Sequence, residues 1–70
     1  MKTLKIGDRV RVSETLASEY AGANGVIVAI EERQAGVIHL SECEVEFRNG
    51  VRRHFLGFQL TRVSAATEGP

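Results

Sequence analysis

The residues of this chain best suited to catalysis or metal binding are one cysteine, Cys43, and two histidines, His39 and His54. A cysteine and two histidines can together hold zinc, but here the histidines lie 15 positions apart with the cysteine between them, which matches no zinc-site pattern. Cys43 also occupies an inward position of an expected strand, where a free cysteine behaves as a small apolar residue. We therefore expect no metal and no other cofactor.

Two further patterns resemble chemical sites but have simpler interpretations. Glu44 and Glu46 lie two apart on an expected strand, which places them together on a solvated face rather than in a catalytic pair. Gly22 and Gly25 precede a strand, whereas phosphate-binding glycine loops precede a helix. No set of residues supplies a positioned base, nucleophile or metal, so we expect that the protein is not an enzyme.

Composition limits the partners of the protein. Nine basic and nine acidic residues cancel, which argues against a domain that depends on phosphate contacts. The single cysteine excludes an intrachain disulfide and suits a reducing compartment. The first residues contain no apolar run of signal-peptide length, and no segment approaches the roughly 20 apolar residues of a membrane helix. These features predict a cytoplasmic protein with no membrane partner.

The chain centres on the segment 21–30, which is rich in β-branched residues and follows a glycine-containing turn. Strict alternation predicts a strand with Val26, Val28 and Ile30 facing the core and Ile27 facing outward. Gly25 is expected to supply a positive φ where the chain leaves the turn.

The segments on either side of this strand differ in clarity. Val10 and Val12 alternate with two arginines, which predicts a half-buried strand after a Gly-Asp turn, and residues 13–24 are expected to form a loop. Residues 32–42 are interpreted as a long, partly ordered loop from which Ile38 or Leu40 folds back onto the core.

The next segment predicts a hairpin. Cys43, Val45 and Phe47 alternate with glutamates, and Asn49-Gly50 is a strong turn signal. A two-residue turn would place Phe47 opposite an arginine. A three-residue loop, residues 48–50, instead places Phe47 opposite Val51, and we prefer this register. It also sets Cys43 opposite Phe55, Glu44 opposite His54 and Glu46 opposite Arg52, and it leaves Arg53 on the core side, at the rim.

The remaining residues complete an all-β fold. We expect a short 3₁₀ turn within residues 56–60 and a last strand, Leu60-Thr-Arg-Val63. Five short strands with turn signals predict a small barrel over residues 1–63. Residues 64–70 are small and polar, and we expect them to form a disordered tail.

The order of these segments resembles known families of SH3-like barrels. Gly7-Asp-Arg-Val-Arg-Val12 and Gly22-Ala-Asn-Gly-Val-Ile-Val28 resemble KOW modules of ribosomal and transcription-elongation proteins. With Val45-Glu-Phe47, Arg53-His-Phe55 and Leu60-Thr-Arg-Val63, the pattern looks like the variable chain of ferredoxin-thioredoxin reductase, and in outline like photosystem I subunit PsaE and the barrel of the nitrile hydratase β-chain. The resemblance implies a five-stranded SH3-like barrel and an accessory role beside a subunit that carries redox or metal chemistry.

A third family, the plasmid-type dihydrofolate reductases, shares the Gly-Asp-Arg-Val-Arg start. Its Gln-Ile-Tyr pore run is replaced here by Arg53, His54 and Phe55, so we reject that activity.

Two surfaces remain as candidate sites, and they lead to two functional hypotheses. The first is a non-catalytic protein-interaction module, an accessory subunit or small homo-oligomer, whose partner is another protein or itself. It would use the outer face of the sheet and the loops at residues 14–24 and 32–42. Its candidate docking residues are Tyr20, Ile27, Leu56 and Phe58. The alternative is a KOW-like nucleic-acid-binding module, or contact with an acidic partner, through the basic C-terminal hairpin residues Arg48, Arg52, Arg53 and Arg62. Ordinary cross-strand pairing with Glu44 and Glu46 would equally explain these arginines.

Overall fold

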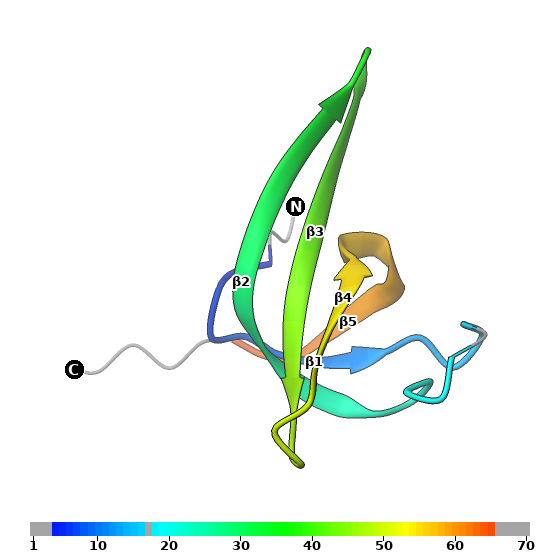
Figure 1. Ribbon diagram of the computed structural model, residues 1–70, viewed down its shortest axis with the longest axis vertical. Helices are drawn as coiled ribbons and strands as arrows, with labels where there is room; N and C mark the ends of the chain where they lie inside the picture. The colour runs from blue at the N-terminus through cyan, green and yellow to red at the C-terminus, as the bar shows by residue number, and fades with distance from the viewer. Residues whose placement is uncertain (1–3, 17, 66–70) are drawn as a thin grey trace.

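The computed structural model describes residues 4–16 and 18–65, which form one antiparallel sheet of five strands (Figure 1). In chain order the elements are β1 (Arg9–Val12), β2 (Asn24–Ala35), β3 (Ile38–Phe47), β4 (Arg52–Leu56), the 3₁₀ turn η1 (Gly57–Gln59) and β5 (Leu60–Ser64).

The strands are hydrogen-bonded in the order β4-β3-β2-β1-β5. Within the described residues β4 and β5 are the two edges, and the sheet is not closed into a barrel, in contrast to the closure that we predicted. The all-β class and the 3₁₀ turn before the last strand are confirmed. No helix among these residues has the length and apolar character needed to cross a membrane.

The core lies on one face of the sheet. Val10 and Val12 are fully buried while their neighbours Arg9 and Arg11 are exposed, so the predicted alternation in β1 is confirmed. In β3 the buried Cys43, Val45 and Phe47 likewise alternate with Glu44 and Glu46, which are partly buried. Removal of this apolar surface from water is the main stabilising contribution in so small a domain. The buried cluster consists of Val10, Val12, Ile27, Cys43, Val45, Phe47, Phe55 and Leu60.

The prediction for the central strand was wrong in its orientation. Ile27 is fully buried, whereas Val26 and Val28 are only partly buried and lie outside the buried cluster. The pairing of β2 with β3 contains a bulge between Ile27 and Ala29. A bulge inserts one extra residue into one strand, so Ile27 and Ile30, three positions apart, both pack on the core. Strict alternation could not place these two residues on one face.

Gly25 also has a different role from the one predicted. The described glycines with positive φ are Gly7, Gly22, Gly36 and Gly50, and Gly25 is not among them. Gly25 pairs with Val10 on one side and Phe47 on the other. A Cβ atom at this position would lie 2.5 Å from Val45 Cγ1 and 2.9 Å from the Glu46 carbonyl oxygen. The close approach of β3 therefore requires glycine here.

Residues 32–42 form regular structure rather than the predicted loop. β2 and β3 pair continuously from Glu31 opposite Glu42 to Ala35 opposite Ile38, and a two-residue turn joins them. Gly36, the first turn residue, has a φ of 64°, the arrangement of a type II′ hairpin turn. Figure 1 shows this hairpin curving well beyond the other strands. Residues 28–41, beyond the pairing of β1 and β4, are called the arm below.

The second hairpin follows the preferred register. Cys43 lies opposite Phe55 and Glu46 opposite Arg52, and the Phe47 N–H donates to the Val51 carbonyl at 2.9 Å. Gly50 has a φ of 83°, as a three-residue loop with a left-handed glycine requires.

The end of the chain is only partly described. β5 extends one residue beyond the predicted boundary, to Ser64, and pairs with β1. The predicted disorder of the tail concerns mainly residues 66–70, which lie outside the described residues.

Candidate protein-docking surface

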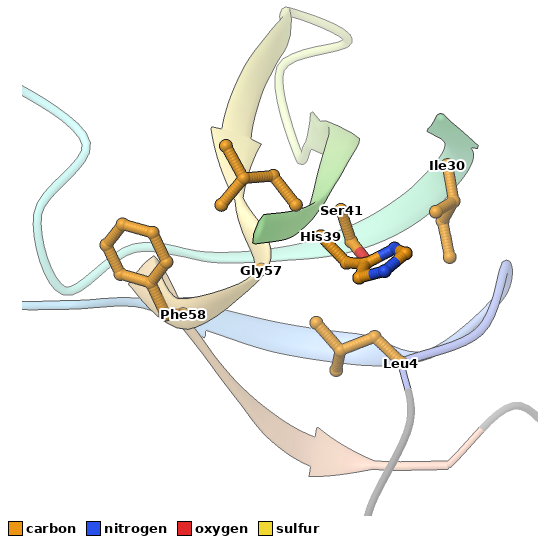
Figure 2. A pocket seen from close by; sticks show the side chains of 7 residues that line it. Leu4, Ile30, His39, Ser41, Gly57 and Phe58 are labelled. Atoms are coloured by element: carbon orange, nitrogen blue, oxygen red, sulfur yellow. The ribbon is translucent and has the colours of Figure 1, made fainter. Parts of the chain in front are cut away.

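A hollow lies at the base of the arm, where β4 ends and η1 turns away from β3 (Figure 2). It encloses about 360 Å³. In the view of Figure 2, Phe58 lies at one end and Ile30 at the other, with His39 and Ser41 between them. The residues that line it are Leu4, Ile30, His39, Leu40, Ser41, Gly57 and Phe58.

The positions of η1 and the arm result from local contacts. The Leu56 N–H donates to Gln59 Oε1 at 2.8 Å, which holds the 3₁₀ turn. Gly57 lies against β3, because a Cβ atom there would be 3.6 Å from Ser41 Cβ. On the arm, Ser41 Oγ donates to Glu32 Oε2 at 2.9 Å. These hydrogen bonds hold Ser41 and η1 in place around the hollow. Among its apolar side chains, Leu4 and Ile30 are partly buried against the core, whereas Phe58 faces solvent.

Large apolar side chains are exposed on the arm and on η1. Phe58 is 75% exposed, Ile38 57% and Val37 94%. Val37 and Ile38 form the tip of the arm, and Phe58 lies at its base. Of the three, Phe58 lines the hollow. A single exposed apolar residue is ordinary, whereas several on one projecting element are typical of a docking surface.

The arm is held in shape by charged pairs on its surface. Arg33 Nη2 lies 3.1 Å from Glu31 Oε1 and 3.0 Å from Glu42 Oε1, so one guanidinium bridges β2 and β3. Exposed pairs of this kind contribute at most about 1 kcal/mol each. They contribute much less to stability than burial of the core does, but they hold the charged side chains of the ribbon in defined positions.

The four predicted docking residues are not brought together. Ile27 belongs to the core, so the outward orientation that we predicted for it is wrong. Phe58 lines the hollow, while Leu56 is half-buried at the end of β4. Tyr20 is part of the core rim instead: its ring stacks on Phe47 with a centroid separation of 4.5 Å.

The four predicted basic residues are also separated. Arg52 lies 3.3 Å from Glu46 and 3.8 Å from Glu44, as the cross-strand interpretation expects. Arg62 Nη1 lies 3.9 Å from the buried Asp8 carboxylate. The Arg53 guanidinium lies 5.6 Å from the centre of the Tyr20 ring, a cation–π contact that lets it leave the core side at the rim.

Arg48 lies in the turn after β3 and lines a second groove, of about 380 Å³. Arg9 and Asn24 line the same groove. Arg48 is therefore grouped with β1 rather than with the arginines of β4 and β5.

The residues considered for catalysis or metal binding lie in separate environments. Cys43 is fully buried, and burial, with a smaller contribution from the Glu32 carboxylate, raises the pKa of its thiol. A protonated, enclosed thiol is a poor nucleophile. His39 lines the hollow, while His54 borders a different depression beside Tyr20. Within the described ranges no three residues among His, Cys, Asp and Glu are grouped as metal ligands would be.

Sequence reasoning missed most of the hollow. Leu4 and Ile30 were assigned to no site, and Leu40 and Ser41 were included only as part of a docking loop, because residues 32–42 were not recognised as strands. The signal that could have revealed the arm is Gly36 at the first position of a two-residue turn, a known hairpin pattern.

Comparisons of the chain with protein-family models, curated proteins and solved structures find no match.

Proposed function

We propose that this protein is a non-catalytic protein-interaction module, an accessory subunit or small homo-oligomer, that docks through the arm and the hollow. The strand order, with a 3₁₀ turn between β4 and β5, is consistent with an open variant of the SH3-like barrel. The observation that carries the proposal is the exposure of Val37 and Ile38 at the tip of the arm and of Phe58 in the hollow at its base. Burial of such side chains contributes roughly 25 cal/mol per Å² of apolar area.

The shape of the arm supports the same role. A two-stranded ribbon is at best marginally stable alone in water, and further strands or packing against another element stabilise it. β1 pairs with β2 only from Asn24 to Val26, and β4 pairs with β3 only from Glu42 to Glu46. The outer part of the ribbon, from Glu32 opposite Ser41 to the turn, therefore projects from the sheet as a contact surface of its own.

The proposal is tested by affinity capture with a matched pair of surface variants. Purified protein is immobilised and exposed to a lysate of its native host, and its own mass in solution is measured by light scattering. Phe58→Ser removes an exposed apolar side chain at the hollow, and Val63→Ser removes one on β5 that is 53% exposed.

We expect the wild-type protein and Val63→Ser to form a stoichiometric complex, with themselves or with another protein, that Phe58→Ser loses. A wild-type protein that is strictly monomeric and captures nothing reproducible would overturn the proposal. Equal capture by Phe58→Ser and wild type would also overturn it, because the contact would then lie elsewhere.

A further inference from the structure

The arm presents a strand edge without a neighbouring strand in the described part of the chain. β4 pairs with β3 only up to Leu56 opposite Glu42, and Gly57 then lies against Ser41. Beyond that point, Ile38, His39 and Leu40 pair with β2 on one side only. Backbone N–H and C=O groups on an unpaired edge are a template for another extended strand.

This edge differs from the other free edges in charge. The free edge of β2 carries Glu31, Glu32 and Arg33, β4 carries Arg52 and Arg53, and β5 carries Arg62. Charged side chains on an edge strand oppose edge-to-edge pairing, and like charges directly opposite each other destabilise a sheet. Ile38, His39 and Leu40 carry no formal charge when the imidazole is neutral. Val28, Ala29 and Ile30 on the free edge of β2 are also uncharged, but they lie between Glu31 and Ile27, whose backbone is already hydrogen-bonded to Gly7 and Asp8. Among the described free edges, the edge of β3 is the one that is uncharged as far as the turn.

We propose that the edge pairs with the same edge of a second copy of this chain, antiparallel, about a two-fold axis through His39. The inference rests on the proposed function and names the partner. Directly opposite residues in an antiparallel pair share a face. An axis through His39 places Ile38 opposite Leu40 of the second copy, and this apolar pair occurs twice by symmetry. The same operation on the free edge of β2, centred on Glu31, Glu32 or Arg33, would oppose two like charges.

The tip and the hollow are complementary under the same symmetry. Val37 precedes Ile38, so in the paired arrangement it reaches the level of Ser41 in the second copy. Ser41 and Gly57 line the hollow there, and Gly57 has no side chain to obstruct the approach (Figure 2). The most exposed apolar side chain of each copy, 94% exposed in one chain, thus reaches the hollow of the other. Tip and hollow are covered in both copies at once.

The register is tested by cysteine cross-linking. Residues on the axis face their own copies, with Cα atoms about 4.5–5.5 Å apart, within the range that a disulfide spans. His39→Cys is therefore expected to form a covalent dimer with diamide as oxidant. Gln34→Cys is the matched control, because Gln34 lies directly opposite His39 on β2 and therefore on the other edge of the arm. The native Cys43 is fully buried and does not compete.

Sedimentation equilibrium tests the interface without a cross-link. The wild-type protein is expected to dimerise reversibly. His39→Lys, which opposes two like charges on the axis, should raise the dimer dissociation constant up to about fivefold, while Gln34→Lys should not.

A wild-type protein that stays monomeric at millimolar concentration, or equal cross-linking of the two cysteine variants, would overturn the inference. If a monomeric wild-type protein still captured a different partner that Phe58→Ser loses, the self-pairing would be wrong and the docking role would stand.

Discussion

A methyl group added at Gly25 should be poorly tolerated, although the residue has an ordinary φ. In Gly25→Ala the new Cβ would lie 2.5 Å from Val45 Cγ1, 2.9 Å from the Glu46 carbonyl oxygen and 3.2 Å from Phe47 Cδ1. Non-bonded carbon atoms prefer separations of about 3.5–4.0 Å. Neither Val45 nor Phe47 has free space, because both are buried, and the Glu46 oxygen belongs to the ladder between β2 and β3. The strands must therefore separate locally.

The expected cost follows from two opposing effects. Overpacking of a well-packed core costs about 1–3 kcal/mol. Loss of glycine's freedom in the unfolded chain returns about 0.4–1 kcal/mol. The free energy of unfolding should fall by about 1–2 kcal/mol, a large part of the total for a domain whose stability is on the order of 0.1 kcal/mol per residue.

Gly57→Ala is the matched control. Its Cβ would meet Ser41 and Leu4 atoms at 3.6–3.8 Å, an ordinary contact, so its stability should be unchanged or slightly higher. Urea unfolding followed by circular dichroism measures both variants. Equal stability of the two would refute the packing argument. In a double-mutant cycle, Val45→Ala should also relieve part of the Gly25→Ala cost, because it removes the closest contact.

Three further predictions concern the core and the loop that precedes β1. Ile27→Ala should lower the free energy of unfolding by about 2–5 kcal/mol and Val28→Ala by clearly less, and urea denaturation showing the reverse order would contradict the bulge. Burial raises the pKa of the Cys43 thiol in the folded protein, so folding favours the protonated thiol. The resulting contribution to the free energy of unfolding is fully present below the unfolded-state pKa of about 8.5, and it is lost as pH rises through the raised pKa of the folded state. The urea midpoint of unfolding should therefore decline more steeply from pH 7 to pH 10 for the wild-type protein than for Cys43→Ala. Parallel pH curves for the two proteins would contradict a contribution from the buried thiol. Asp8→Ala should cost about 1–3 kcal/mol in thermal or urea unfolding, because the buried carboxylate accepts the Lys5 N–H at 2.9 Å, and an unchanged midpoint would show that this contact is dispensable.

The sequence predicted elements whose pattern was local and regular. β1 alternates strictly, and the hairpin of β3 and β4 was placed in its correct register by matching apolar and charged pairs across Asn49-Gly50. In both cases neighbouring residues alone determine which face is buried.

The failures concern features set by tertiary contact. The bulge beside Ile27 leaves no mark in a run of β-branched residues, so alternation predicted the wrong face. The arm is polar on β2 and interrupted by Gly36, so it resembled a loop, and only its pairing with β3 makes it a strand. The hollow joins Leu4, the arm and η1, segments far apart in the chain, and no local pattern indicates that they meet.

Closure of the sheet could likewise not be predicted from the number of strands. The pattern indicated five strands but not whether β4 and β5 would pair. Closure depends on strand tilt and stagger, which the apolar pattern does not specify.

The most direct test of the docking surface is a map of amide chemical shifts by NMR, recorded on the isotope-labelled protein while its own concentration, or that of a captured partner, is raised. The account predicts shifts concentrated on Ile38 to Ser41 and on Gly57 and Phe58, with the groove at Arg9 and Arg48 unchanged. Shifts centred on that groove, with the arm unaffected, would contradict it.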